Sequence, residues 1–212
     1  MVRGRLKKPK DLLIRTGISL FGASTAEAVS TDEIIRAGGV SKQTFYNHFK
    51  DKSALTREVL RVVRQDYEAS CARINRDERD SARRVARALC VYARLAVDNK
   101  QRGRVLARML IEDLAFDNDT NQGVISDVSS GLADGRLGVL SLETGVAFIF
   151  GVTQALVARV LTCNDVTTAV AVSQQFGTLL LRAFGISATE SEMIAAQAAD
   201  KIVRTGLDSE HL

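Results

Sequence analysis

A short polar stretch near the N-terminus combines residue types that can bind a nucleic acid. If Val40 to Phe49 form a helix, Val40, Phe45 and Phe49 lie near one apolar stripe, because residues four and five apart stay close at 3.6 residues per turn. The other faces carry one cation and hydrogen-bonding groups only, namely Lys42, Gln43, Thr44, Tyr46, Asn47 and His48. The absence of a carboxylate suits contact with phosphates, and Gln and Asn can each bond adenine at two points.

The residues in front of this stretch complete a two-helix unit. Ser30 or Thr31 is expected to be an N-cap, because a hydroxyl can accept a hydrogen bond from a free amide of the first turn. Asp32 and Glu33 then place negative charge where the helix dipole favours it, and Gly38-Gly39 ends the helix. Two short helices joined by a glycine turn, the second with a polar outer face, predict a helix-turn-helix.

In these residues the chain resembles the TetR family of transcriptional regulators. The resemblance consists of Ile34 and the string G-V-S-x-x-T-F-Y-x-H-F-x-x-K-x-x-L, which runs from Gly39 to Leu55. It covers roughly residues 10 to 60. The family often has a glycine and an aromatic residue between its first two helices, where this chain reads Ala23 to Ala28 without either.

The resemblance implies an all-α fold with two parts. Residues 1–64 are expected to form a three-helix, helix-turn-helix DNA-binding head with a basic N-terminal arm. Residues 65–212 are expected to form a helical bundle that binds an effector and dimerises. We expect Lys42, Gln43, Thr44 and Asn47 to contact base edges. The residues expected to hold phosphates are Thr31, Tyr46, His48 and Lys52, the last at the N-terminus of the next helix.

The charge distribution agrees with a polyanion-binding N-terminal part. Residues 1–64 contain 13 of the 29 Lys and Arg residues and 6 of the 25 Asp and Glu residues. Residues 65–212 contain the other 16 basic and 19 acidic residues. The excess of basic residues is therefore confined to the part with the helix-turn-helix. Five of these cations form an arm before the first helix: Arg3, Arg5, Lys7, Lys8 and Lys10. Such an arm can contact phosphates or a minor groove, or it can be a solubilising tail.

The resemblance also implies an inducer cavity between the body helices and the helix that links them to the head. The candidate lining residues are Tyr92, Leu106, Met109, Leu110, Asp113 and Phe116. A stripe of methionine and aromatic residues at helical spacing is more often part of a plain hydrophobic core. Because the chain has no Trp and few aromatic residues, an apolar or weakly polar small molecule is favoured over a cationic ligand in an aromatic cage.

The last third of the chain predicts a pair of apolar helices. One spans Leu142 to Leu161 and is apolar nearly all round, and the other spans Val166 to Phe184. The short loop between them predicts antiparallel packing. The resemblance implies that this pair meets its two-fold mate in a homodimer, through Phe148, Gly151, Ala155, Phe176 and Leu180. The alternative is burial within one subunit. Two reading helices one DNA turn apart, about 34 Å, require such a dimer.

Several classes of protein are disfavoured by composition. Two His residues, one on the reading helix and one at position 211, exclude a His-based triad and a multi-His metal site. No nucleotide-binding glycine motif is present, so neither catalysis, a cofactor nor a metal is expected. Cys71, Cys90 and Cys163 are an odd number that suits a reducing cytoplasm, either as small buried side chains or as a redox sensor. No apolar run reaches the ~20 residues of a membrane span, and no signal peptide is expected.

We therefore expect a cytoplasmic, homodimeric, sequence-specific DNA-binding transcription regulator. Its expected partners are a palindromic operator in double-stranded DNA and a small apolar effector that releases it, as a repressor would be released. The alternative is a helix-turn-helix protein without small-molecule input, controlled by a protein partner or by its own level. Sequence features do not separate these two hypotheses.

Overall fold

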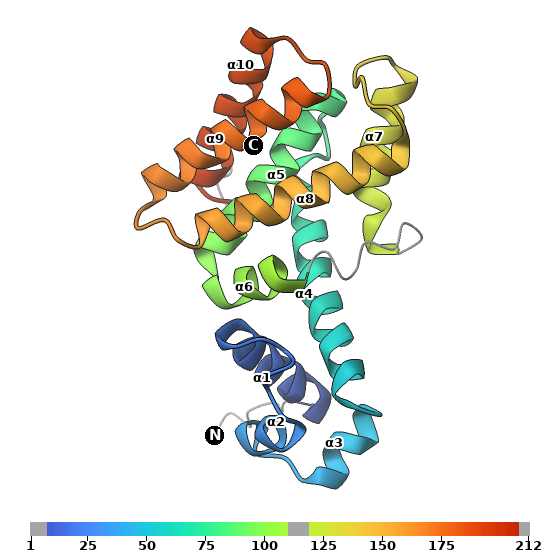
Figure 1. Cartoon of the computed structure of the whole chain (residues 1–212), viewed down its shortest axis with the longest axis vertical. Helices are drawn as coiled ribbons and strands as arrows, with labels where there is room; N and C mark the ends of the chain where they lie inside the picture. Colours follow the sequence, from blue (N-terminus) through green and yellow to red (C-terminus); the bar gives the residue numbers. More distant parts are fainter. Residues whose placement is uncertain (1–7, 110–118, 208–212) are drawn as a thin grey trace, which may run out of the picture.

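The computed structural model describes residues 8–109 and 119–207, and these residues are helical with no strand among them. Three helices form the head at the lower end of Figure 1: α1 (Pro9–Ala23), α2 (Thr31–Gly38) and α3 (Lys42–His48). Helix α4 (Lys52–Ile74) rises from the head into the body. The all-α prediction is confirmed. The predicted division between residues 64 and 65 falls inside α4 and stays a prediction.

Side-chain caps set the starts of the head helices. The hydroxyl of Ser30 accepts from the amide of Glu33 at 3.1 Å, so Ser30 rather than Thr31 is the N-cap of α2. Ser41 caps α3 in the same way, and the carboxylate of Asp51 caps α4 by accepting from Ala54 at 2.7 Å. Gly39 ends α2 with a φ of 59°, which a glycine adopts without steric cost.

The three helices of the head and the start of α4 share one hydrophobic core. Leu13, Ile34, Phe45, Leu55 and Val59 are completely buried in it. The predicted apolar stripe of the reading helix is therefore confirmed for Phe45, and the buried Phe49 and half-buried Val40 follow it. Burial of Phe45 and Phe49 fixes which faces of α3 point outward.

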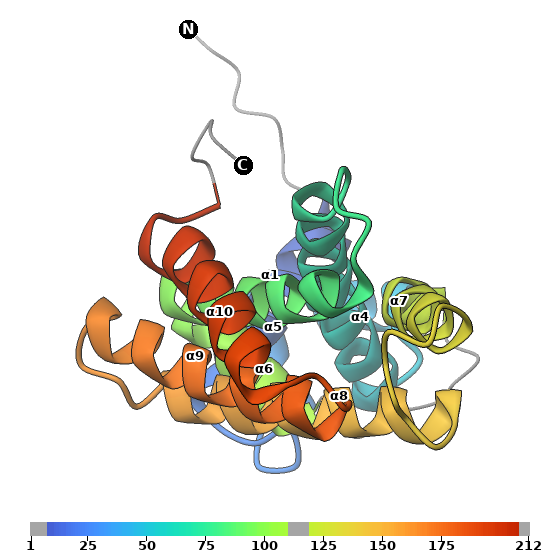
Figure 2. The ribbon, with the colours of Figure 1, turned by 90° about the horizontal axis from the view of Figure 1, so that it is seen from above.

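The body is built around α5, which packs against α4, α6, α7, α8, α9 and α10 and lies in the middle of the view in Figure 2. More than half of its residues are buried. The elements of the body are α5 (Ser81–Asp98), α6 (Lys100–Met109), the 3-10 turn η2 (Asp119–Asn121), α7 (Gln122–Ala133), α8 (Leu142–Val160), α9 (Val166–Ala183), α10 (Ala188–Ala198) and the π-helical η3 (Ala199–Arg204).

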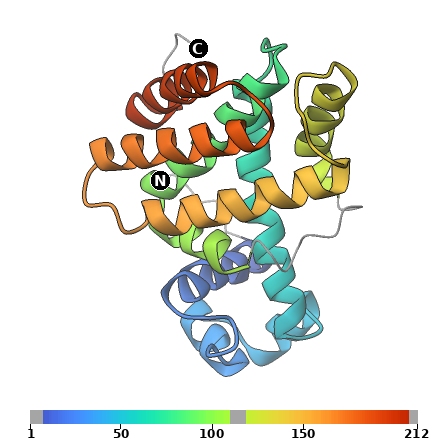
Figure 3. The same ribbon diagram turned by 45° about the horizontal axis from the view of Figure 1, so that its top comes forward.

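Helices α8 and α9 lie side by side in opposite directions, as their short connection predicts (Figure 3). Apolar side chains remain uncovered on this pair, because Phe148 is 44% exposed and Leu179 is 65% exposed. Gly151 and Ala155 are exposed beside Phe148, whereas Phe176 is half-buried. Leu180 is completely buried within the protomer, so its predicted place in an interface was wrong and its neighbour Leu179 faces outward instead.

Helix α8 is also long and apolar enough to cross a membrane when judged by length and composition alone. Of its apolar window, 44% is buried inside the protein. The core helix of a folded bundle can pass the same test of length and composition. The helix is therefore weak grounds for a membrane span.

The head meets the body where α1 packs on α6. Gly22 lies so close to α6 that an added Cβ would come within 2.8 Å of the carbonyl oxygen of Gln101. The guanidinium of Arg108 donates to the carbonyl oxygens of Phe21 at 2.7 Å and Ser24 at 2.6 Å. Since these carbonyls belong to the open C-terminal end of α1, Arg108 both satisfies them and fastens the head to α6.

Candidate functional site

The outer face of α3 carries the polar side chains that the sequence pattern predicts. Lys42, Gln43, Asn47 and His48 are exposed, and Tyr46 is half exposed while its ring meets the buried Phe45 edge-on. The amide of Gln43 donates to the side-chain oxygen of Asn47 at 2.9 Å. This bond aligns two side chains one helical turn apart, so both amides present their remaining groups on the same face.

Two of the predicted contact residues are less open. The hydroxyl of Thr44 lies 2.8 Å from that of Ser41, so it takes part in the N-terminal cap of α3 and is half-buried. Thr31, the first residue of α2, is also half-buried. Both remain at the N-terminal ends of their helices, where free amides can hold a phosphate.

Lys52 has a different task from the phosphate contact predicted for it. Its ammonium donates to three backbone carbonyls of the α1–α2 connection, those of Ala26 at 2.8 Å, Glu27 at 3.3 Å and Val29 at 2.9 Å. An ammonium has three N–H donors, and all three are used here. Lys52 therefore fastens the loop before α2 to the start of α4, and the predicted role was wrong.

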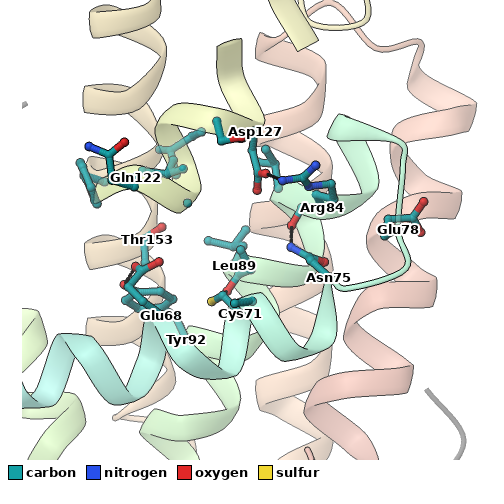
Figure 4. A pocket seen from close by; sticks show the side chains of 18 of the residues that line it. Glu68, Cys71, Asn75, Glu78, Arg84, Leu89, Tyr92, Gln122, Asp127 and Thr153 are labelled. Carbon is teal, nitrogen blue, oxygen red and sulfur yellow. Dashed lines mark hydrogen bonds and ion pairs between the residues drawn. The ribbon is translucent and has the colours of Figure 1, made fainter. Parts of the chain in front are cut away.

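A cavity of about 520 Å³ lies in the body between α4, α5, α7 and α8 (Figure 4). Its size is within the usual range for small-molecule sites. Much of its wall is hydrocarbon, and the apolar side chains that line it are Val85, Ala88, Leu89, Val124, Ile149 and Phe150. Its polar lining includes Glu68, Asn75, Arg84, Tyr92, Asp127 and Thr153.

The cavity is not where the sequence-based interpretation placed it. Tyr92 lines it as predicted, but Leu106 is completely buried in the core and does not line it. Met109 ends α6, and its side chain is not described. Leu110, Asp113 and Phe116 lie outside the described residues. The prediction assigned the wall to α6, whereas the wall comes from the inner faces of α4, α5, α7 and α8.

One polar group of the cavity joins α4 to α5. The hydroxyl of Tyr92 donates to the carboxylate of Glu68 at 2.6 Å. Burial raises the pKa of Glu68, and the hydrogen bond from Tyr92 opposes that rise. In Figure 4 Glu68, Tyr92 and Thr153 gather at one side of the cavity. The charge of Arg64 on the same helix also lowers the pKa of this carboxyl.

A second polar group lies at the other side and joins α5 to α7. Arg84 forms an ion pair with Asp127. The amide of Asn75 donates to the backbone carbonyl of Arg84 at 3.0 Å. Burial raises the pKa of Asp127 to about 6, although Arg84 lowers it. Two buried carboxylates, from α4 and α7, therefore face the same cavity.

Arg64 supports the cavity wall from the middle of α4. It is completely buried, and its guanidinium donates to the side chain of Asn121 at 2.6 Å. The same group lies 5.4 Å from the ring centre of Phe150, which lines the cavity. A cation over an aromatic face is favourable when both are shielded from water. Arg64 thus joins α4, η2 and α8.

Burial also bears on the cysteines. Cys90 is buried, and burial raises the pKa of its thiol to about 12. Burial raises the pKa of Cys71 as well, although Cys71 lines the cavity. A thiolate is the reactive form, so these two thiols behave as small apolar groups at neutral pH. Among residues 8–109 and 119–207, no group of three or more His, Cys, Asp or Glu could hold a metal ion.

Replacing Lys52 with Met should destabilise the head. The carbonyls of Ala26 and Val29 would lose their donor in a partly buried setting, which costs about 1–3 kcal/mol of the free energy of unfolding. Urea denaturation measures the change. Lys50→Met, at an exposed position, is the control and should stay within about 0.5 kcal/mol of the wild type. If both variants changed the free energy of unfolding by the same amount, Lys52 would not hold the loop, and the phosphate contact predicted from sequence would be favoured again.

The stability of the protein should depend on pH through Asp127. Because its pKa is raised from 3.8 to about 6, the folded state binds this proton more tightly than the unfolded state. The contribution is fully present below pH 3.8 and is lost as the pH rises through about 6. The wild type should therefore lose on the order of 2–3 kcal/mol relative to Asp127→Asn across that window, measured by urea denaturation.

The comparison uses how the free energy of unfolding changes with pH in the wild type and in Asp127→Asn. Any pH-independent loss of stability from pairing Arg84 with an amide therefore cancels. Asp165→Asn is the control, because hydrogen bonds from Thr168 lower the pKa of Asp165 and the exposed residue caps α9. Its pH-dependent difference should have the opposite sign. Parallel pH curves for the wild type and Asp127→Asn would contradict the raised pKa.

Comparison with known proteins agrees with the geometry of the head. Residues 13–59 match the bacterial regulatory proteins of the tetR family. No curated protein matches the sequence closely enough to count as a relative. Solved structures match the fold over most of the chain.

One is RolR in complex with the ligand resorcinol, which is 22% identical, with a TM-score of 0.63 over 90% of this chain and 94% of that one. Another is a bacterial regulatory protein in the tetR family from Rhodococcus RHA1, which is 18% identical, with a TM-score of 0.64 over 85% and 99%. A third is a gamma-butyrolactone receptor described as ArpA-like, which is 16% identical, with a TM-score of 0.60 over 92% and 97%.

At these identities the structural likeness shows the fold alone, while the match of residues 13–59 covers the helix-turn-helix and the first turns of α4. The matched span contains the exposed polar face of α3 and the core that orients it. Residues 13–59 therefore match the tetR family of bacterial regulatory proteins, and the chain as a whole shares the fold of solved regulators of that family.

Proposed function

We propose that this regulator is a homodimeric repressor that binds a palindromic operator and is released by a small, mainly apolar effector in the cavity. The observation that carries the proposal is the course of α4. Its first half, through Leu55 and Val59, belongs to the core of the head, and its second half, through Glu68 and Cys71, lines the cavity. At 1.5 Å per residue, these 23 residues span about 35 Å.

The hydrogen-bonded length of α4 gives an effector a direct route to the DNA-binding head. A molecule that fits only one spacing of α4, α5, α7 and α8 stabilises the position of α4 that goes with that spacing. The contact between α1 and α6, through Gly22 and Arg108, offers a second route. Release then requires that the effector bind the released state more tightly than the DNA-bound state.

The exposed face of α3 would read the operator. We assign base contacts to Lys42, Gln43 and Asn47, with Thr44 in a smaller part because its hydroxyl is shared with Ser41. Tyr46, His48 and Thr31 would hold phosphates. Lys52 leaves this set because its three donors are used within the head.

The uncovered apolar side chains of α8 and α9 support the homodimer. Phe148, Gly151 and Ala155 recur at three- and four-residue spacing, which places them on one face of α8. Leu179 and the half-buried Phe176 add the corresponding apolar area of α9. Small residues next to a large ring allow two helix pairs to approach closely. A two-fold axis here would pair two heads on a palindrome.

The nature of two proteins with this fold supports a ligand in the cavity. RolR has been solved with resorcinol, and the ArpA-like protein is a gamma-butyrolactone receptor. Both ligands named there are small molecules. The cavity of about 520 Å³ in this chain has room for a molecule of that kind.

Selection of binding sites from random duplex DNA, at a fixed salt concentration, tests the DNA-binding part of the proposal. The wild type should enrich a palindrome with half-sites about ten base pairs apart. Gln43→Ala should relax the preference at one or two base pairs by ~1–3 kcal/mol, because a direct base contact is lost. Tyr46→Phe is the matched comparison and should lower the affinity for all DNA sequences by the same factor. Binding without any enriched motif would refute sequence-specific recognition.

Gly151→Arg should separate the dimer. Apart from its chain neighbours and the backbone of α8, no atom of the described residues lies within 4 Å of a Cβ at this position, so the helix accepts a side chain there. Two opposed arginines at the interface should give monomers in sedimentation, and operator affinity should fall by roughly 100-fold as the second head is lost. Ala69→Arg, exposed on α4, is the control and should stay dimeric. A Gly151→Arg dimer would place the interface elsewhere.

A further inference from the structure

Two residues that line the cavity have buried side-chain atoms that lack a hydrogen-bond partner within the described part of the protein. The side-chain oxygen of Asn75 accepts no hydrogen bond, and the Nε of Arg84 donates none. Both residues line the cavity. Because an unsatisfied buried donor or acceptor costs about 1–3 kcal/mol, such atoms in a native protein call for a partner.

The contacts of these two residues fix which atoms are left over. The NH₂ of Asn75 donates to the backbone oxygen of Arg84, so the amide oxygen is the atom without a partner. The outer nitrogen of Arg84 pairs with Asp127, which holds the guanidinium and leaves its Nε without an acceptor. Figure 4 shows Asn75, Arg84 and Asp127 gathered at one side of the cavity. An acceptor on Asn75 and a donor on Arg84, two residues joined by that hydrogen bond, are therefore without a partner at this side of the cavity.

A hydroxyl is the group that fits both vacancies, since it donates one hydrogen bond and accepts others. A carboxylate only accepts, and it would lie beside Asp127. An ammonium only donates, and it would lie beside the guanidinium of Arg84. An ether or a ketone could accept from Arg84 but would leave the oxygen of Asn75 without a donor.

The rest of the cavity favours an uncharged, mainly apolar body. Val85, Leu89, Ile149 and Phe150 line it with hydrocarbon and an aromatic ring. The acidic side chains that line it, those of Glu68, Glu78 and Asp127, are matched by the guanidinium groups of Arg76 and Arg84 in its wall and of Arg64 behind Phe150. A charged ligand would lose its hydration without gaining a surplus of opposite charge.

We propose that the occupant of this cavity is an uncharged, largely apolar molecule that carries a hydroxyl group, which accepts from Arg84 and donates to Asn75. The inference rests on the proposed function in taking that occupant as the effector. It adds the chemical class of the molecule and the two residues that select it.

Four probes that share one ring system test the proposal: 2-naphthol, naphthalene, 2-naphthoate and 2-naphthylmethylammonium. Isothermal calorimetry on the full-length wild-type protein measures each affinity. We expect 2-naphthol to bind about tenfold or more tightly than naphthalene, because only the hydroxyl fills both vacancies. The two charged probes should bind more weakly than 2-naphthol.

Asn75→Leu locates the selectivity, and Val124→Ala is its matched control in the same cavity. Asn75→Leu should reduce the affinity for 2-naphthol by about tenfold and leave that for naphthalene unchanged. Val124→Ala enlarges the cavity without touching a polar group and should change both affinities by the same factor. If Asn75→Leu folds poorly, the ratio of the affinities of the wild type for 2-naphthol and naphthalene still tests the proposal, because it needs no variant.

Equal binding of 2-naphthol and naphthalene would overturn the inference and mean that water alone serves the two atoms. Tighter binding of either charged probe would also overturn it, while the cavity would remain an effector site. If 2-naphthol binds as expected but does not release the protein from its selected operator duplex, the inference stands and the ligand-released repressor fails. Absence of binding by all four probes would refute both.

Discussion

The structure depends on one constraint, which is that a single helix packs against both the head and the body. Asp51 caps the start of α4, and from there the helix continues without a break to Ile74. Val59 is buried in the head and Cys71 is buried beside the cavity, so neither the head nor the body can shift along the helix without the other. A protein assembled in this way need not have a separate hinge between the part that reads DNA and the part that admits a ligand.

The head was predictable from sequence because its determinants are local. The spacing of Phe45 and Phe49, the caps at Ser41 and Asp51, and the glycine at the turn each act within one or two helical turns. They fix which side of α3 is buried, and so they also fix which side is exposed. The match of residues 13–59 to the tetR family confirms this region, while its individual DNA contacts stay predictions.

The cavity was not predictable because it depends on how distant segments pack. Arg84 and Asp127 meet only when α5 packs against α7, and the sequence around either residue does not predict their ion pair. Leu180 was misplaced for a related reason, since one residue of rotation on α9 decides whether Leu179 or Leu180 faces the core. The role of Lys52 was also not predictable from sequence, because it depends on the path of the loop that ends near Val29.

The close approach of Gly22 to Gln101 means that the angle of the head is set by two main chains in contact. Substitutions on the outer surfaces of α1 and α6 leave this contact in place, because it joins Gly22 to the main chain of Gln101. The same feature makes position 22 the natural place to change that angle deliberately. A residue larger than glycine there would act as a spacer between head and body, and in a dimer it would alter the distance between half-sites that the protein prefers.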